Sequence, residues 1–185
     1  MIEELNKRLE ILELEKIIEI KKPRVVFLEN ARNMLNHNNG QTFSKILNSL
    51  KTMGYHTNCQ ILNTKSFGNL PQNRERLYIV AFLNESEYKK FEFPKIIKRT
   101  KTLHDVIDFD SKLNDRFYYT EENFKAYDLL ESEIKSNKTC YQWRRNYVRE
   151  NKSNLCPTLT NNPSLHEQSG CFRAAVPRYD FSRCR

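Results

Sequence analysis

The chain has 185 residues, 38% of them hydrophobic and 29% charged, which is typical of a globular protein with one domain or one domain and a smaller appendage. No run approaches the roughly 20 apolar residues of a membrane-spanning helix, and the charged first 20 residues exclude a secretion signal, so we expect an intracellular protein without membrane contact. The formal charge of +8 suits a polyanionic partner such as DNA, but it is equally compatible with a basic protein that binds no nucleic acid. Five scattered cysteines and four histidines show no spacing typical of disulfides or a metal site.

The first part of the chain alternates helix and strand patterns. Apolar residues at steps of three and four predict a helix over residues 2–18. The continuous run Val25–Leu28 then predicts a strand that is buried on both faces. Thr42 is a plausible N-cap for a helix over residues 43–53, which Gly54 closes.

Two further strands are predicted, over residues 55–62 and 77–82. This order of elements is typical of an α/β layered domain. Three strands and two helices would leave one sheet face and one edge uncovered, so the pattern implies a partner or a further segment of chain. The composition changes near Glu85, where a basic linker over residues 89–101 precedes a polar, helix-like segment over residues 121–136.

Glu29 and Asn30 end the first predicted strand and form the first candidate site. In doubly wound sheets, functional groups lie just beyond the carboxyl ends of the strands. Taken alone, the pair favours a structural interpretation, in which Glu29 caps the next segment or pairs with a Lys.

Arg74 and Arg76 form the second candidate site, directly before the third strand. Residues at alternate positions of an extended chain point to the same face. Each guanidinium offers a rigid set of donors that suits a carboxylate, a phosphate or a base carbonyl. Taken alone, the two arginines are also compatible with an ordinary charged strand edge.

Together these segments resemble the cytosine-5 DNA methyltransferase family. Residues 23–30 resemble its Glu-Asn-Val motif strand, with alanine at position 31 where valine is usual. Residues 67–76 resemble its Phe-Gly-Val-Pro-Gln-x-Arg-x-Arg motif, with one extra residue, Asn69 or Leu70. Residues 156–160 resemble the segment that follows the family's target recognition region. Several separated motifs in the family's order are more specific than any single one.

The resemblance implies an α/β fold with three parts. Residues 1–94 are expected to form the C-terminal part of a Rossmann-like, S-adenosylmethionine-dependent methyltransferase domain. Residues 95–160 are expected to form a small target recognition domain, and residues 161–185 an atypical, disordered tail. A cytoplasmic, nucleoid-associated protein of a prokaryotic restriction-modification system is the implied setting.

The chemistry implied by the resemblance is methyl transfer to a flipped cytosine in double-stranded DNA. A cysteine thiolate adds to carbon 6, and carbon 5 then accepts the methyl group of S-adenosylmethionine. Glu29 would bind the pyrimidine N3 and the exocyclic amine, and Arg76, with Arg74 beside it, would hold the base carbonyl oxygen. Asn30 and Gln72 would support the site structurally.

Two requirements of that chemistry are missing from the sequence. The family's nucleophile lies in a Pro-Cys motif upstream of the Glu-Asn motif, but no cysteine precedes Glu29. Cys59 lies inside a predicted strand and is interpreted as a core residue or as a residue without a specific role. None of the four glycines opens the strand-turn-helix that cradles the cofactor, so we expect no cofactor-binding residues and no activity of the chain alone. An N-terminal half or a companion subunit with the catalytic cysteine would be needed.

An aromatic and basic segment supplies the candidate DNA contacts. They are Tyr141, Trp143, Arg144, Arg145, Tyr147 and Arg149. For Trp143, a place in the core of the small domain is the alternative interpretation. Two other readings of the whole chain stay open: a non-catalytic, sequence-specific DNA-binding module or subunit, and a chain that does not fold stably without its missing half.

Overall fold

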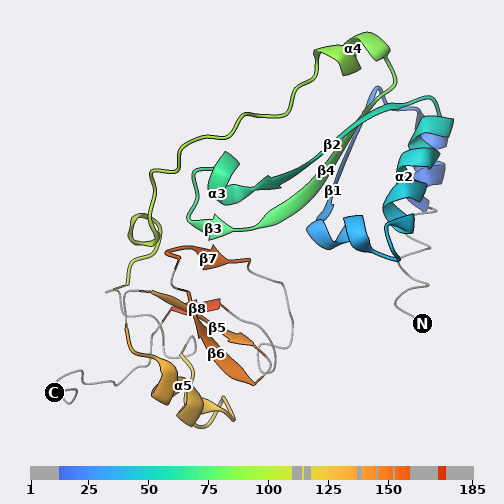
Figure 1. Cartoon of the computed structure of the whole chain (residues 1–185). Coiled ribbons are helices and arrows are strands. Elements are labelled where there is room, and N and C mark those ends of the chain that lie inside the picture. Colours follow the sequence, from blue (N-terminus) through green and yellow to red (C-terminus); the bar gives the residue numbers. More distant parts are fainter. Residues whose placement is uncertain are drawn as a thin grey trace. The chain divides into compact units, whose positions relative to one another are not determined.

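The computed structural model describes residues 13–109, 114, 118–136, 139–144, 146–151, 153–158 and 171–173. Contacts divide the chain into two compact units (Figure 1). Unit 1 comprises Met1–Asn63 and Glu75–Ile96, and unit 2 comprises Thr64–Arg74 and Ile97–Arg185. The expected boundary after residue 94 lies two residues before the end of unit 1 at Ile96, and residues 161–185 group with unit 2. The segment Thr64–Arg74 also groups with unit 2, although it lies within the first 94 residues.

Unit 1 is built on a three-stranded antiparallel sheet. Its central strand is β4 (Glu75–Phe82), flanked by β1 (Val25–Ala31) and β2 (His56–Asn63). The segments around the strands are a helix over residues 13–21, η1 (Arg32–Asn36), α2 (Gln41–Thr52) and α4 (Glu85–Lys90). Mixed helix and strand agrees with the expected α/β class, and no helix in the described part of the chain is long and apolar enough to span a membrane.

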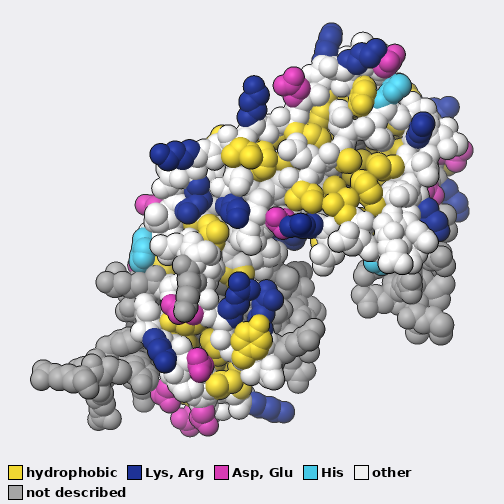
Figure 2. All heavy atoms as spheres, in the orientation of Figure 1, with side chains coloured by type: hydrophobic (Ala, Val, Ile, Leu, Met, Phe, Trp, Pro, Cys, Tyr) yellow, Lys and Arg dark blue, Asp and Glu magenta, His cyan; other side chains and the backbone are white. Residues whose placement is uncertain are grey.

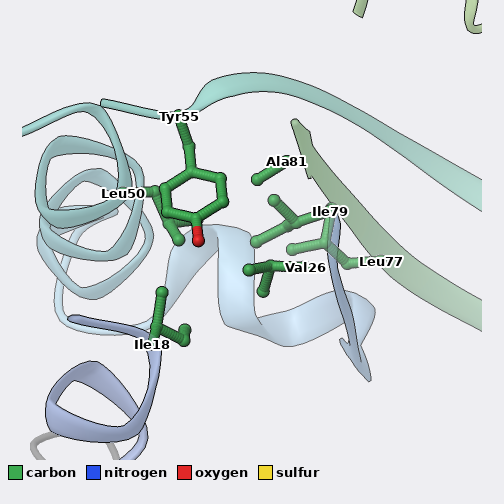
Figure 3. Packing of buried hydrophobic residues seen from close by; sticks show 7 residues of the cluster. All are labelled: Ile18, Val26, Leu50, Tyr55, Leu77, Ile79 and Ala81. Carbon is green, nitrogen blue, oxygen red and sulfur yellow. The ribbon is translucent and has the colours of Figure 1, made fainter. Parts of the chain in front are cut away.

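One face of this sheet carries the core of unit 1 (Figure 3). Leu77, Ile79 and Ala81 alternate along β4, so their side chains point to the same face, where Val26 from β1 joins them. Three more buried residues cover this face: Ile18 and Leu50 from the helical segments, and Tyr55 from the connection between α2 and β2. The Tyr55 hydroxyl donates a hydrogen bond of 2.7 Å to the Pro23 carbonyl, which fastens the start of β2 to the chain entering β1.

The other face of β1 is open, and the expectation that this strand is buried on both faces is wrong. Phe27 is 63% exposed and Val25 is 44% exposed. The cause is topological, since β1 lies at the edge of the described sheet, whereas α4 packs against β2 and β4, and Phe91 packs against Phe82 of β4. Figure 2 shows the resulting hydrophobic side chains gathered over β1 and β4.

The ends of α2 are set by glycines. Gly40, not Thr42, is the N-cap, because Asn38 and Asn39 both adopt positive φ and deliver the chain to a left-handed Gly40 with φ of 81°. The Thr42 hydroxyl instead lies 2.7 Å from His37 Nδ1. At the other end Gly54, with φ of 91°, follows the C-cap as predicted.

Unit 2 contains a second antiparallel sheet, in which β5 (Cys140–Arg144) lies between β6 (Tyr147–Glu150) and β8 (Cys171–Arg173). The strand β8 lies in the segment expected to be a disordered tail, so that expectation fails at these three residues; the rest of 161–185 lies outside the described residues. The other elements of unit 2 are α3 (Thr64–Phe67), β3 (Gln72–Asn73), η2 (Leu103–Asp105), α5 (Tyr127–Glu133) and β7 (Cys156–Pro157).

The core of unit 2 forms around Trp143. Phe124 meets the Trp143 ring edge to face, with ring centroids 5.3 Å apart, and Leu130 from α5 completes the buried cluster. The predicted helix over residues 121–136 is shorter than expected, because residues 121–126 form turns that bring Phe124 onto Trp143 before α5 begins.

Candidate active site

The side chains of Glu29 and Arg76 meet on the open face of the unit 1 sheet. Glu29 pairs with Tyr78 across the ladder and Ala31 pairs with Arg76, so Glu29 and Arg76 are diagonal neighbours on one face. Arg76 Nε lies 2.7 Å from Glu29 Oε1. The Arg76 side chain is 18% exposed and the Glu29 side chain is 42% exposed, so the arginine is more deeply buried and the carboxylate remains accessible.

A second ion pair lies beside the first. Arg32, in η1 directly after β1, places Nη1 2.7 Å from Glu75 Oε2 at the start of β4. The Arg76 guanidinium also donates from Nη1 to the Glu75 carbonyl at 2.9 Å. The end of β1 and the start of β4 are therefore joined by two salt bridges in addition to the ladder.

Partly exposed ion pairs contribute little to stability, typically about 0–1 kcal/mol. The Glu29–Arg76 pair is thus a weak contributor to the fold of unit 1, which the apolar core holds together. Its physical effect is to fix a carboxylate and a guanidinium side by side at an accessible position, as a site for a hydrogen-bonding ligand would require.

Asn30 turns its side chain back onto the chain. Its Oδ1 accepts a hydrogen bond of 2.8 Å from the backbone N–H of Ala31. This contact occupies the carboxamide locally at the point where β1 passes into η1. A supporting role at the site remains a prediction.

Gln72 and Arg74 belong to unit 2, whereas Glu29 and Arg76 belong to unit 1. The short strand β3 pairs in parallel with β7, with Gln72 opposite Cys156. Thr64 holds the same segment from the other side: its hydroxyl donates to the Gln72 carbonyl at 2.6 Å, and its N–H donates to the Arg74 carbonyl at 3.2 Å. The motif segment is thereby fixed within unit 2 up to Arg74.

Comparison with known proteins decides the family. A model of the C-5 cytosine-specific DNA methylase family matches residues 6–178. This chain belongs to that family. It is 54% identical over 147 residues to the Type II methyltransferase M.Bsp6I of Bacillus sp. (strain RFL6), a match that covers 80% of the chain and 47% of that relative. It is 38% identical over 109 residues to the Type II methyltransferase M.HaeII of Haemophilus aegyptius, covering 59% of the chain and 33% of that protein.

The chain therefore spans about half the length of the first of these relatives and about a third of the second. Among solved structures, the Entamoeba histolytica methyltransferase EhMeth matches with a TM-score of 0.42 and 23% identity, over 58% of this chain and 31% of that one. That likeness is too low to add to the assignment, which rests on the sequence matches.

Membership of the C-5 cytosine-specific DNA methylase family implies S-adenosylmethionine as methyl donor, but the described residues do not fit this cofactor by themselves. Gly40 and Gly54 serve the two ends of α2, and Gly68 is closed off because a Cβ there would lie 3.1 Å from the Thr64 carbonyl oxygen. None of these three glycines opens a backbone cradle, and Gly170 lies outside the described residues. Among the described residues, no cluster of His, Cys, Asp or Glu could hold a metal ion.

Cys59 does not complete a methylase site with Glu29. It lies opposite Ile79 in the ladder, whereas Glu29 lies opposite Tyr78, so the two side chains point to opposite faces of the sheet. Of the two interpretations of Cys59, the core residue is wrong, because β2 forms an edge of the described sheet and Cys59 is exposed.

Two of the expected DNA contacts are core residues. Tyr141 is only 1% exposed, and its hydroxyl accepts hydrogen bonds from the backbone N–H groups of Lys135 and Ser136, at 3.2 and 3.0 Å. Trp143 is 8% exposed within the cluster described above. Both were expected to touch DNA. Their burial favours a place in the core of unit 2, which was the alternative interpretation for Trp143, and a contact with DNA stays an untested prediction for both.

Three of the remaining candidates share one face of the β5–β6 hairpin. Arg144 lies opposite Tyr147 and Arg149 lies opposite Gln142, which places these side chains on the face away from Trp143. Arg144, Tyr147 and Arg149 are exposed, and we call them the basic face. Figure 2 shows Lys and Arg side chains over β5 and β6. Arg145, another candidate, lies outside the described residues.

Sequence reasoning overlooked Arg32 and Glu75. Glu75 stands inside the recognised motif, between the two arginines, and Arg32 follows Glu29 by three residues. Only the strand register shows that they pair, because the partners are 43 residues apart in the chain.

Proposed function

We propose that this chain supplies the Glu and Arg half of the active site, together with the DNA-reading unit, of a Type II DNA cytosine-5 methyltransferase. The observation that carries the proposal is the contact of 2.7 Å between Arg76 Nε and Glu29 Oε1 on an accessible sheet face. Two motifs separated by more than 40 residues of sequence supply complementary groups at one place, as a pocket for a flipped pyrimidine needs.

In this proposal, Glu29 binds the ring N3 and the exocyclic amine of the flipped cytosine, and Arg76 holds both the Glu29 carboxylate and the base carbonyl oxygen. When a thiolate adds to carbon 6, electron density moves into the ring toward N3, and Glu29 supplies the compensating proton or hydrogen bond. A group already fixed where charge develops lowers the barrier without reorganising during the reaction. The methyl group itself comes from S-adenosylmethionine.

The complementary half would carry the nucleophilic cysteine and the cofactor site. Two observations support such a half: M.Bsp6I is about twice as long as the matching region, and the face with Phe27 and Val25 exposes apolar side chains beside the edge strand β1. In this proposal the added half extends the sheet of unit 1 into a complete Rossmann-like domain, and the chain alone is inactive.

Unit 2 would act as the target recognition domain. The basic face of the β5–β6 hairpin combines Arg144 and Arg149, which suit phosphates and base edges, with Tyr147, which supplies an exposed aromatic ring. Double-stranded DNA is the proposed partner, which would place the working assembly with the nucleoid.

Complementation tests the function. The chain is mixed with the part of M.Bsp6I that it does not match, and transfer of labelled methyl groups from S-adenosylmethionine to duplex DNA is measured. We expect no transfer by either part alone, transfer by the mixture, and loss of transfer when this chain carries Glu29→Gln. Transfer by the chain alone would contradict the proposed division of the site, and a mixture insensitive to Glu29→Gln would contradict the role of the Glu29–Arg76 pair.

A DNA-binding module without catalysis is the second candidate, favoured by the separate core that unit 2 builds around Trp143. It predicts that the chain alone binds one short DNA site more tightly than unrelated duplexes, and that no complementary half restores methyl transfer.

A further inference from the structure

A basic stretch of unit 2 is held by hydrogen bonds to the segment Thr64–Arg74, which connects β2 to β4. The N–H of Ile97 donates to the Ser66 carbonyl at 2.9 Å, and the N–H of Thr100 donates to Asn69 Oδ1 at 2.8 Å. The N–H of Lys101 reaches the same Oδ1 at 3.3 Å. We call residues 97–101 the clamped segment, because contacts at both of its ends hold an otherwise extended chain.

Asn69 makes this clamp with its whole carboxamide. Oδ1 accepts from two backbone N–H groups, while Nδ2 donates to Thr100 Oγ1 at 3.0 Å. Its backbone is left-handed, with φ of 50°, a conformation in which asparagine is enriched. Asn69 is also one of the two residues, with Leu70, of which one is extra relative to the family motif. The clamp therefore lies at the position where the loop is longer than the motif.

The clamped segment carries basic side chains and contains no acidic residue. Between Glu92 and Asp105 the sequence has four bases and no acid. Lys98 and Lys101 are exposed, and the partly buried Arg99 donates from its guanidinium to the Lys101 carbonyl. Figure 2 shows Lys and Arg side chains along the course that the chain takes after α4 in Figure 1.

We propose that Lys98, Arg99 and Lys101 form a contact site for the phosphates of duplex DNA, and that Asn69 holds this site in place. The inference rests on the proposed DNA-binding function and adds a second contact surface to the basic face of the β5–β6 hairpin. Basic side chains that serve only to interact with solvent do not need a fixed backbone. Lys and Arg side chains on an anchored backbone lose less conformational entropy when they bind phosphates. Such contacts position a protein on DNA without reading its sequence.

Salt dependence of binding tests the contacts. The full chain is titrated against a labelled duplex at several salt concentrations, and the slope of log K against log salt is compared with that of the triple variant Lys98→Gln/Arg99→Gln/Lys101→Gln. Each phosphate contact contributes about 0.9 to the slope, so we expect the slope to fall by about two to three. The matched control removes three exposed bases from the helices of unit 1, with Lys16→Gln/Lys21→Gln/Lys45→Gln, and should leave the slope nearly unchanged.

Asn69→Gly tests the clamp separately. Glycine accepts the left-handed backbone without strain, so the substitution removes the carboxamide and leaves the loop conformation accessible. The three bases remain, and we expect weaker binding at every salt concentration with a slope close to that of the unsubstituted chain. A melting curve recorded for each variant confirms that the chain is folded.

An equal fall in slope for the triple variant and its matched control would overturn the proposal, as would an unchanged slope or no binding of duplex DNA by the unsubstituted chain. Unaltered affinity of Asn69→Gly would overturn the role of the clamp. Methyl transfer is measured separately in the complementation experiment. Its failure would overturn the proposed catalytic function while a slope change in the triple variant would still support the phosphate contacts.

Discussion

Arg76 Nε lies 2.7 Å from Glu29 Oε1, across a diagonal of the ladder between β1 and β4. The Arg76 side chain is largely buried, whereas the Glu29 carboxylate is accessible to solvent. Arg76 therefore holds the carboxylate in a fixed position while leaving it accessible. The neighbouring Arg32–Glu75 pair ties the same two strand ends. This arrangement separates two properties that mutation can measure independently: stability, to which the pairs add little, and ligand binding.

Glu29→Gln should therefore leave the fold intact and abolish most of the proposed chemistry. We expect a change in unfolding free energy of no more than about 1 kcal/mol, as for other exposed ion pairs. Methyl transfer by the complemented enzyme should fall by about 10²–10³-fold, the typical loss when a charge-stabilising group is removed. Glu85→Gln, which breaks an exposed pair with Lys89 on α4, is the control and should change neither quantity.

Trp143→Ala should lower the free energy of unfolding of unit 2, because Trp143 is a core residue and not part of the basic face. Truncating a buried aromatic residue costs about 3–5 kcal/mol, and here it also removes the edge-to-face contact with Phe124. Urea denaturation followed by circular dichroism measures the loss. Tyr147→Ala, at an exposed position of the same hairpin, should change stability by less than about 0.5 kcal/mol and weaken DNA binding instead. Equal stability losses for the two variants would contradict the assignment of faces.

The contrast between these two residues shows what the sequence could predict. Aromatic residues alternate with polar or basic ones over residues 141–144, so a strand with two unlike faces could be predicted. Which face is core depends on Phe124 and Leu130, which come from a turn and a short helix whose packing no local pattern reveals. Tyr141 illustrates the same limit, because its hydroxyl is satisfied by backbone groups after α5 and not by solvent.

Tyr55→Phe should lower the stability of unit 1 and reduce its sensitivity to alkali. Burial raises the pKa of Tyr55, whose hydroxyl donates to the Pro23 carbonyl. The folded chain thus holds this proton more tightly than the unfolded chain, in which tyrosine titrates near pH 10. The stabilisation is complete below about pH 10 and is lost as the pH rises through the higher pKa of the folded state.

Melting curves between pH 8 and pH 11 test this prediction. At pH 8 the variant should lose about 0.5–1.5 kcal/mol, the usual net contribution of one hydrogen bond. Above pH 10 its stability should fall less steeply than that of the unsubstituted chain. An identical alkaline slope for both would show that Tyr55 does not titrate in this range.

Phe27→Ser should reduce self-association of the isolated chain. Its ring is mostly exposed and contacts Tyr78, with ring centroids 5.6 Å apart, on the open face of the sheet. Exposed apolar faces beside an edge strand promote association between chains. Sedimentation velocity over a range of concentrations measures the effect, with Ile20→Ser on the helix of residues 13–21 as the control for removing an exposed apolar side chain elsewhere. Equal effects of the two substitutions would argue against a specific role of the sheet face.

The number of predicted strands and helices indicated that one face of the sheet would be uncovered, but it did not indicate which face. The run Val25–Leu28 is equally apolar at every residue, so periodicity could not distinguish the covered side from the open one. Asn69 presents the opposite case. Comparison with the motif marks an extra residue at this loop, yet its purpose depends on a partner 31 residues away. Motif spacing located both candidate sites, whereas the contacts that define them come from long-range register.

The grouping of Thr64–Arg74 with unit 2 has a consequence for synthesis on the ribosome. The three described strands of the unit 1 sheet are all available once residue 82 has emerged, whereas the parallel pairing of β3 with β7 must wait for residues 156 and 157. During that interval the loop between β2 and β4 would extend from a formed sheet without its final partners, and closing so long a span slows its completion. The order of events places the nascent methylase motif among the last parts of the chain to become native.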